Sequence, residues 1–188
     1  MKKILLFASG TGSNVENIIQ YFEKKLDITV VGVFTNNPNA KVLDKAEKYG
    51  IPTLIFNKEE LNGDFVLARV DELQPDLIVL AGFLWKFPAP IIAKYPNKII
   101  NIHPALLPKY GGKGMYGMKV HQTILENKEK ETGITIHYVN EHYDEGEFIL
   151  QQKVNIEDCA SADDIVVKVH KLEHKYFPET IERLLRLA

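Results

Sequence analysis

The sequence has little cysteine, no strong excess of charge of either sign and no long apolar run. Its single cysteine, Cys159, excludes an internal disulfide framework and is natural for a cytoplasmic protein. Because Glu157 and Asp158 precede it and disfavour the thiolate, we do not expect a nucleophilic role. The formal net charge of -2 gives no bulk attraction to nucleic acid or to an anionic membrane. The longest apolar run, residues 77–85, is far shorter than the roughly 20 residues that cross a bilayer.

Two common nucleotide-binding signatures are incomplete in the loop Ser9-Gly10-Thr11-Gly12-Ser13-Asn14. The loop lacks the lysine of a P-loop, and Val15 stands where a dinucleotide fingerprint has a third small residue. The loop nevertheless follows an apolar run and opens a helical pattern, where backbone N–H groups and the helix dipole bind phosphate. Ser13 and Asn14 add side-chain hydrogen bonds, which favours a single phosphate group over a pyrophosphate. The alternative is a tight turn in which Ser13 or Asn14 caps the helix.

The first hundred residues alternate between short apolar runs and helical patterns. The expected strands are residues 3–7, 28–35, 53–56, 77–81 and 99–103, and the expected helices are 15–24, 40–49, 64–73 and 90–94. Such alternation predicts an α/β, Rossmann-like fold with a mostly parallel central sheet flanked by helices. The length of 188 residues and the absence of a linker or repeat favour a single domain over residues 1–188.

The pattern changes after residue 103. We expect a glycine-rich loop over residues 109–117, a helix over 119–127, and two strands over 133–139 and 148–154. A last helix over 162–187 opens with a cap signal at Ser161, and Pro178 should kink or break it. The loop is either a lid or a solvated segment, and His121 either lines a nearby cleft or caps its own turn.

Asn101 and His103 stand two residues apart at the end of an apolar strand, which Pro104 terminates. Residues at this spacing point to the same side of a strand, so both side chains can reach one small group. An amide donor beside an imidazole suits a reaction in which negative charge develops on a carbonyl oxygen. The alternative is a histidine that is merely satisfied at a strand end.

A polar loop, residues 140–146, joins the last two strands and contains Asp144. If Asp144 approaches His103, it favours the charged imidazole, raises the pKa of that ring and can order a water for proton transfer. The alternative is an exposed loop acid, and Glu141 and Glu145 compete for the same role.

The segment His170-Lys171-Leu172-Glu173-His174 matches an H-x-x-E-H metal-binding pattern on a predicted helix. No third ligand is apparent in a matching context, so we expect no metal. The alternative is a half-buried helical face whose polar side chains are turned toward a cleft.

Taken together and in order, these motifs resemble the phosphoribosylglycinamide formyltransferase family, folate-dependent enzymes of purine biosynthesis. The resemblance is carried by Ser9 to Asn14, Leu80 to Phe83, Asn101 to Pro104, Leu106 to Tyr110, His121 with Gln122, Asp144 with Gly146, and Glu173 with His174. It implies the formyltransferase fold and transfer of a formyl group from 10-formyltetrahydrofolate to the amine of glycinamide ribonucleotide.

The resemblance also implies roles for individual residues. Protonated His103 and the Asn101 amide stabilise a tetrahedral oxyanion, while Asp144 raises the pKa of His103 and helps to move protons through water. The ribonucleotide contacts Gly12, Ser13 and Asn14 through its phosphate, and His170 and Glu173 through the rest of the molecule. The folate contacts Leu84, Trp85, Lys86, Phe87, Asn101, Asn140, Glu141, His142, Tyr143 and Asp144. The resemblance further implies a cis Leu107–Pro108 bond, no metal, and a monomer or homodimer.

Three other functions remain open from the sequence. The alternatives to a phosphoribosylglycinamide formyltransferase are another folate-dependent formyltransferase, a formyltetrahydrofolate hydrolase and a non-catalytic phosphate-binding module. The enzymes share the Asn-x-His core, whereas the binding module uses only the loop at Gly12 to Asn14.

Overall fold

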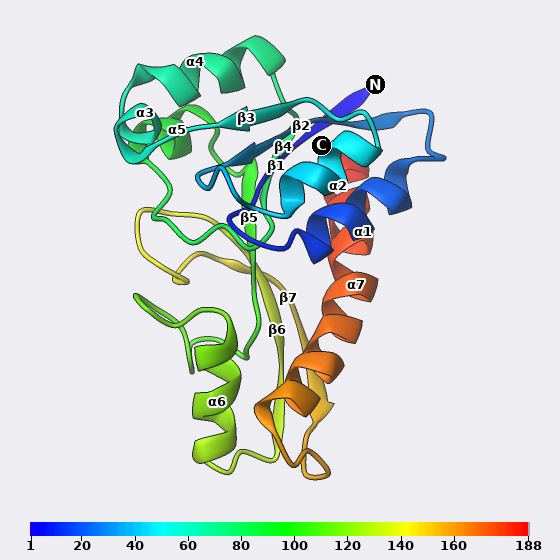
Figure 1. Cartoon of the computed structure of the whole chain (residues 1–188), viewed down its shortest axis with the longest axis vertical. Coiled ribbons are helices and arrows are strands. Elements are labelled where there is room, and N and C mark those ends of the chain that lie inside the picture. Colours follow the sequence, from blue (N-terminus) through cyan, green and yellow to red (C-terminus); the bar gives the residue numbers. More distant parts are fainter. Residues whose placement is uncertain (188) are drawn as a thin grey trace.

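The computed structural model describes residues 1–187, which form one seven-stranded sheet flanked by helices (Figure 1). The strands are β1 (Lys2–Phe7), β2 (Ile28–Thr35), β3 (Thr53–Ile55), β4 (Leu77–Leu80), β5 (Ile99–His103), β6 (Glu131–Tyr138) and β7 (Phe148–Asn155). The helices are α1 (Ser13–Phe22), α2 (Val42–Lys48), α3 (Lys58–Asn62), α4 (Asp64–Leu73), α5 (Ala89–Lys94), α6 (Met118–Glu126) and α7 (Ala162–Leu187).

The strand order is β3-β2-β1-β4-β5-β6-β7, with β1 to β5 parallel and β6 and β7 antiparallel. This confirms the predicted α/β fold with a mostly parallel sheet. The chain leaves β1 toward β2 on one side and later returns to β4 on the other. The carboxyl ends of β1 and β4 therefore diverge at a topological switch point, which is where open α/β sheets bind ligands.

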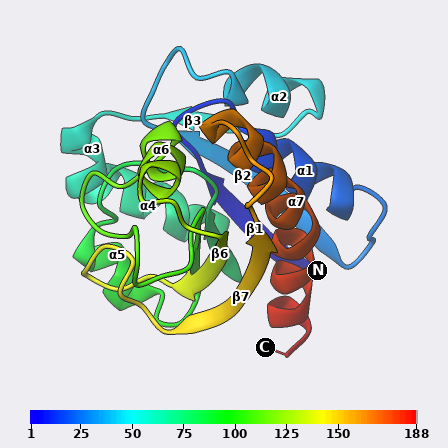
Figure 2. The ribbon, with the colours of Figure 1, turned by 90° about the horizontal axis from the view of Figure 1, so that it is seen from below.

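The central strand β1 separates two hydrophobic cores. Its side chains alternate: Ile4 and Leu6 face one core, Leu5 and Phe7 face the other, and all four are fully buried. The first core packs the sheet against α1, α2, α6 and α7, and the second packs it against α3, α4 and α5. Figure 2 shows α1, α2 and α7 on one side of the parallel strands and α3, α4 and α5 on the other.

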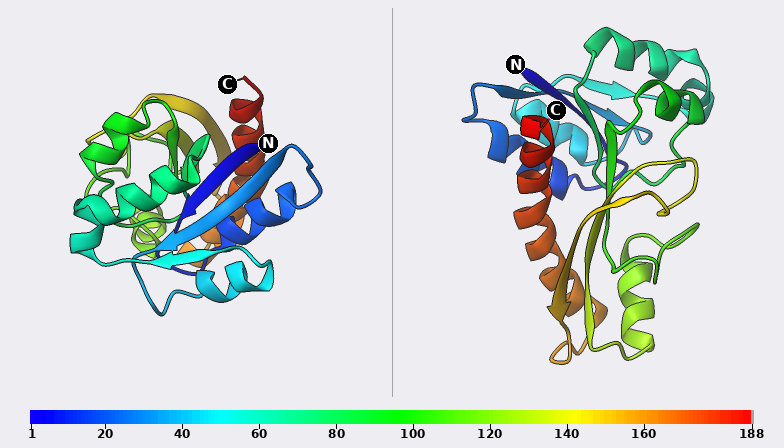
Figure 3. Two further views of the ribbon diagram at one scale, coloured as in Figure 1. Left: turned by 90° about the horizontal axis from the view of Figure 1, so that it is seen from above. Right: turned by 180° about the vertical axis from the view of Figure 1, so that it is seen from behind.

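The antiparallel strands extend beyond the parallel part of the sheet. There α7 packs along β6 and β7, and α6 packs against α7 (Figure 3). β6 pairs with both β5 and β7, and the loop over residues 139–147 that joins β6 to β7 brings Asp144 beside His103 at the end of β5. Among residues 1–187, no helix combines the length and apolar character that a bilayer crossing needs.

The last helix, α7, runs unbroken through Pro178, so the expected break there is wrong. Proline has no N–H to give the carbonyl of His174, four residues earlier. The side-chain amide of Asn17 in α1 donates to that carbonyl instead, at 2.8 Å. A tertiary hydrogen bond thus satisfies the group that proline leaves open.

Local signals account for the remaining boundaries. The cap expected at Ser161 is present, because its hydroxyl accepts from the Asp164 N–H at 3.2 Å while Asp164 accepts from the Ser161 N–H at 2.9 Å. The five-residue helix α3 was not predicted, although Asn57 and Glu60 form a capping box in front of it. The peptide bond between Leu107 and Pro108 is cis, as the resemblance implied.

Candidate active site

A cavity of about 560 Å³ lies at the carboxyl ends of β1, β4 and β5. Loops that follow these strands form three of its walls, and β6, α6 and α7 contribute the others. Every residue with a predicted site role lines this cavity except Glu141, which is exposed. The fold therefore brings together segments that lie up to about 160 residues apart in the sequence.

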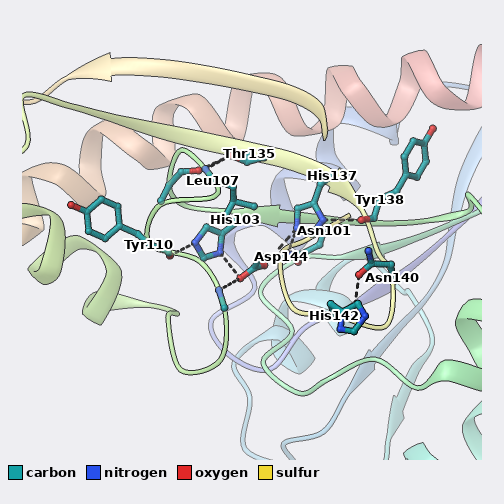
Figure 4. Close-up of polar contacts among 12 residues, drawn as sticks. Asn101, His103, Leu107, Tyr110, Thr135, His137, Tyr138, Asn140, His142 and Asp144 are labelled. Atoms are coloured by element: carbon teal, nitrogen blue, oxygen red, sulfur yellow. Dashed lines mark hydrogen bonds and ion pairs between the residues drawn. The ribbon is translucent and has the colours of Figure 1, made fainter. Parts of the chain in front are cut away.

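His103 is held on the floor of the cavity at the end of β5 (Figure 4). Only 4% of the residue is exposed. Its Nε2 lies 2.7 Å from the carbonyl oxygen of Tyr110, so this nitrogen carries the hydrogen and donates it. Its Nδ1 lies 3.5 Å from Oδ2 of Asp144. Both ring nitrogens thus face oxygen acceptors, an arrangement that only the protonated ring satisfies fully.

Burial nevertheless lowers the pKa of His103 below its ordinary value. The negative charge of Asp144 raises that pKa, as expected, but the loss of solvation is the larger effect. The predicted direction of the Asp144 effect is therefore present, whereas the net pKa is lower than the sequence suggested.

Asp144 lies between two histidines and is mostly buried. Its Oδ1 is 3.6 Å from Nε2 of His137, and its Oδ2 accepts from the Gly112 N–H at 2.9 Å. Burial acts to raise the pKa of Asp144, but these hydrogen bonds and the two histidines outweigh it and hold the pKa below its ordinary value. Asp144 is thus an ionised group of the cavity wall rather than an exposed loop acid.

Gly146 explains why the loop after β6 can bring Asp144 to this position. A Cβ atom on Gly146 would lie 1.6 Å from the carbonyl oxygen of Tyr138. Only glycine permits this close approach of the two backbones. Asp144 itself has a φ of 57°, in the left-handed region.

His137 in β6 was not predicted as a site residue. It lies opposite Asn101 in the β5–β6 register, and its Nδ1 donates to the Tyr138 carbonyl at 2.8 Å. Its Nε2 lies 3.2 Å from Nδ2 of Asn101 and 3.6 Å from Oδ1 of Asp144. His137 thus contacts both the amide and the carboxylate beside His103. The register of the two strands identifies His137, and that register is not readable from the sequence.

The loop at Gly12 to Asn14 forms the opposite end of the cavity. Gly12 has a φ of 69°, and a Cβ atom there would lie 2.4 Å from the Val42 side chain. No side chain caps α1, so the alternative in which Ser13 or Asn14 caps the helix is wrong. The first N–H groups of α1 are consequently left for a ligand.

Glu173 on α7 closes this end of the cavity. It is 6% exposed and accepts a hydrogen bond from Nδ2 of Asn14 at 3.1 Å. Burial raises its pKa to about 7. His170 lines the cavity one turn earlier, and its ring stacks on that of His174 with centroids 6.0 Å apart. Within residues 1–187, no three His, Cys, Asp or Glu side chains are grouped so as to hold a metal ion.

Comparisons with known proteins agree with this geometry. A family model described as formyl transferase matches residues 2–181. The chain belongs to the formyl transferase family. It is 36% identical to phosphoribosylglycinamide formyltransferase of Bacillus subtilis strain 168, covering 100% of this chain and 96% of that protein. It is also 37% identical to the chloroplastic phosphoribosylglycinamide formyltransferase of Arabidopsis thaliana, covering 96% of this chain.

The predicted family resemblance is therefore confirmed. The chain spans 64% of the Arabidopsis protein and 61% of its Vigna unguiculata counterpart. A crystal structure of phosphoribosylglycinamide formyltransferase from Bacillus halodurans superposes with a TM-score of 0.88 at 32% identity, covering 98% of this chain and 95% of that one.

The loop over residues 109–117 belongs to the site and is not simply solvated. The Tyr110 carbonyl and the Gly112 N–H bind His103 and Asp144, as described above. The Tyr110 hydroxyl donates to Glu129 at 2.8 Å and accepts from Asn127 at 3.0 Å. The loop is thus anchored at the far end of α6 while its backbone orients the two titratable groups of the site.

The remaining wall of the cavity combines apolar and polar groups. Leu84 is 43% exposed at its opening, whereas Phe87 is buried against Phe7 in the core. Across the opening, Oδ1 of Asn140 accepts from the His142 N–H at 2.9 Å and shapes the loop that carries Tyr143. This opening suits a flat, partly apolar ligand.

Proposed function

We propose that this chain transfers a formyl group from 10-formyltetrahydrofolate to the amine of glycinamide ribonucleotide. The observation that carries the proposal is the arrangement of Asn101, His103 and Asp144 between two chemically different ends of one cavity. One end offers the free start of α1, and the other offers the partly apolar opening near Leu84. Family membership supports a formyl donor of the folate type, and the relatives' names supply the acceptor.

The two ends of the cavity suit the two proposed ligands. Gly12, Ser13 and Asn14 bind the phosphate, while His170 and Glu173 contact the rest of the ribonucleotide. The folate lies against Leu84 to Phe87 and against the loop over residues 140–144, with Asn101 between the two ligands. Glu141 is exposed at the rim, so its proposed contact is with a part of the folate that extends out of the cavity.

The reaction follows from the groups on the cavity floor. The ribonucleotide amine attacks the formyl carbon, and the carbonyl electron pair moves onto oxygen. The Asn101 amide and Nδ1–H of His103 stabilise that oxyanion, because Nε2 of His103 is already bonded to the Tyr110 carbonyl. Water held by Asp144 carries the proton from the attacking nitrogen to N10 of the folate. The carbon–N10 bond then breaks as the carbonyl re-forms.

The site uses no metal in this scheme, and we propose a monomer or homodimer acting in the cytoplasm. The scheme needs no metal because the amide, imidazole and carboxylate groups on the cavity floor suffice for the charge and proton movements described.

Spectrophotometric release of deformylated folate, with and without glycinamide ribonucleotide, tests the proposal. We expect release only when the ribonucleotide is present. Release that is independent of the ribonucleotide would instead establish a hydrolase, and no release would favour another formyl acceptor or a binding module.

His103→Ala separates an enzyme from a binding module. For the enzyme, we expect turnover to fall by about 10²- to 10⁴-fold while ribonucleotide affinity is retained, because the imidazole acts on charge that develops only during the reaction. A near-normal rate in this variant would show that the assigned role of His103 is wrong.

A further inference from the structure

His121 lines the same cavity but has no part in the scheme above. It lies in the first turns of α6 and is 4% exposed. Neither ring nitrogen makes a hydrogen bond to any residue in 1–187, and Nδ1 is fully enclosed. A buried polar ring without a partner destabilises a folded protein and therefore calls for an explanation.

A second unpartnered atom lies on the same cavity. Oδ1 of Asn14 is buried and has no hydrogen-bond partner, although Nδ2 of the same side chain donates to Glu173. These two atoms are the buried side-chain nitrogen and oxygen atoms found without partners in the described part of the chain. Both residues line the cavity, so a polar ligand there would contact side chains whose hydrogen bonding within the protein is incomplete.

The surroundings of His121 select an uncharged ligand group. Burial, with smaller contributions from His170 and His103, lowers its pKa to about 4, so the ring is neutral at pH 7. The enclosed Nδ1 faces no acceptor, so the single hydrogen of the neutral ring belongs on Nε2. A neutral donor suits a hydroxyl or carbonyl oxygen better than a phosphate, for which a charged donor binds more strongly.

We propose that His121 is a substrate-binding residue whose ring donates a hydrogen bond to an uncharged oxygen of the ribonucleotide, in the ribose or the glycinamide group. This inference rests on the proposed function. His121 lines the cavity together with His170, at the ribonucleotide end, and His103, at the reacting centre. Its partner on the substrate therefore lies between the phosphate and the amine.

Binding calorimetry and thermal unfolding of His121→Leu and His121→Gln test this inference. The ligands are glycinamide ribonucleotide, ribose 5-phosphate and inorganic phosphate, at pH 7.5. We expect His121→Leu to weaken ribonucleotide binding by about tenfold, the upper range for a neutral hydrogen bond, and to leave phosphate binding unchanged. His121→Gln keeps a donor and should retain part of the affinity. Gln122→Leu, exposed on the same helix, is the matched control.

The ligand-free protein provides an independent readout. Because His121→Leu removes a buried polar ring that lacks a partner, we expect its Tm to be equal to that of the wild type or higher by about 2–4 °C. Weaker ribose 5-phosphate binding would assign the contact to the ribose, whereas a loss confined to the ribonucleotide would assign it to the glycinamide group. Both results support the inference.

Three results would overturn it. Equal ribonucleotide affinity in wild type and His121→Leu would remove the contact, and an equal loss of phosphate affinity would show that the group recognised is charged. A lower Tm together with loss of all binding would show a structural role. If the wild-type protein itself fails to bind the ribonucleotide, the proposed function fails first, and that outcome is distinct from a failure of His121 alone.

Discussion

At the scale of single residues, the site depends on carboxylates and imidazoles whose burial opposes their charge. His103 shows the conflict directly: burial lowers its pKa, while Asp144 raises it. Since the charged ring is the better donor to an oxyanion, Asp144 is the group that keeps the charged form accessible.

Asp144→Asn removes this support. We expect the limb of the pH–rate profile that reports loss of the His103 proton to move to lower pH, because the pKa of His103 falls further. At pH 7.5, kcat/KM should fall by about 10²-fold or more. The measurement is kcat/KM from pH 5 to 9, with Glu145→Gln, an exposed neighbour in the same loop, as control. A profile that superimposes on that of the wild type would refute the assigned role.

The raised pKa of Glu173 predicts that the free energy of unfolding depends on pH. Its pKa is about 7 in the folded protein and 4.5 when exposed, so the folded protein holds a proton that the unfolded chain has lost. Stability from this group is fully present below pH 4.5 and declines as pH rises to 7. The corresponding free energy is about 3 kcal/mol at most.

Glu173→Gln should therefore match the wild type in unfolding free energy near pH 4.5 and exceed it at pH 8. Urea unfolding at both pH values measures this difference between the two proteins. His121 lowers the stability of both proteins as pH falls below 6.5, because its pKa is lowered in the folded state. This contribution is the same in the wild type and in Glu173→Gln, so it cancels when their unfolding free energies are subtracted. A constant difference across this range would contradict the raised pKa of Glu173.

At the scale of elements, sequence patterns predicted most of the chain. The bounds of β2, β5, α4 and α7 agree with the expected ranges, because each combines a clear apolar pattern with a turn or cap signal. The helix α3 was missed because five residues show no period. The continuity of α7 through Pro178 was not predictable, since it depends on Asn17 from a different helix.

A double-mutant cycle tests this account of α7. Asn17→Ala leaves the His174 carbonyl without its donor, so we expect a loss of about 1 kcal/mol in unfolding free energy. In a Pro178→Ala background the residue at 178 regains an N–H for that carbonyl, and the same Asn17 substitution should have a smaller effect. Additive losses in the cycle would mean that Asn17 does not compensate for the proline.

At the scale of the whole molecule, the cavity joins loops from both halves of the chain. The apolar strand pattern predicted that Asn101 and His103 lie at the end of a strand, and the family resemblance identified Asp144. The register of β5 with β6 could not be read from the sequence, and so His137 was missed. The contact of the Tyr110 carbonyl with His103 depends on the conformation of the glycine-rich loop over residues 109–117 and could not be predicted from the sequence either.

The core also connects to one wall of the cavity. Phe7 of β1 is fully buried and packs edge-on against Phe83 and Phe87, both in the segment that leads along the proposed folate side. We expect Phe7→Ala to lower the unfolding free energy by about 3–5 kcal/mol. In the remaining folded protein, folate affinity should fall more than phosphate affinity, as measured by calorimetry at 10 °C. Equal losses for both ligands would show that the two ends of the cavity are not independently supported.

The central claim is that a formyl group passes directly to the ribonucleotide amine. The most direct test uses 10-formyltetrahydrofolate labelled with ¹³C in the formyl group, with mass spectrometry of the products. The account predicts ¹³C-formylated glycinamide ribonucleotide in an amount equal to the deformylated folate, and about 10²- to 10⁴-fold less of it with His103→Ala over the same time. Labelled formate in place of the formylated ribonucleotide would contradict it.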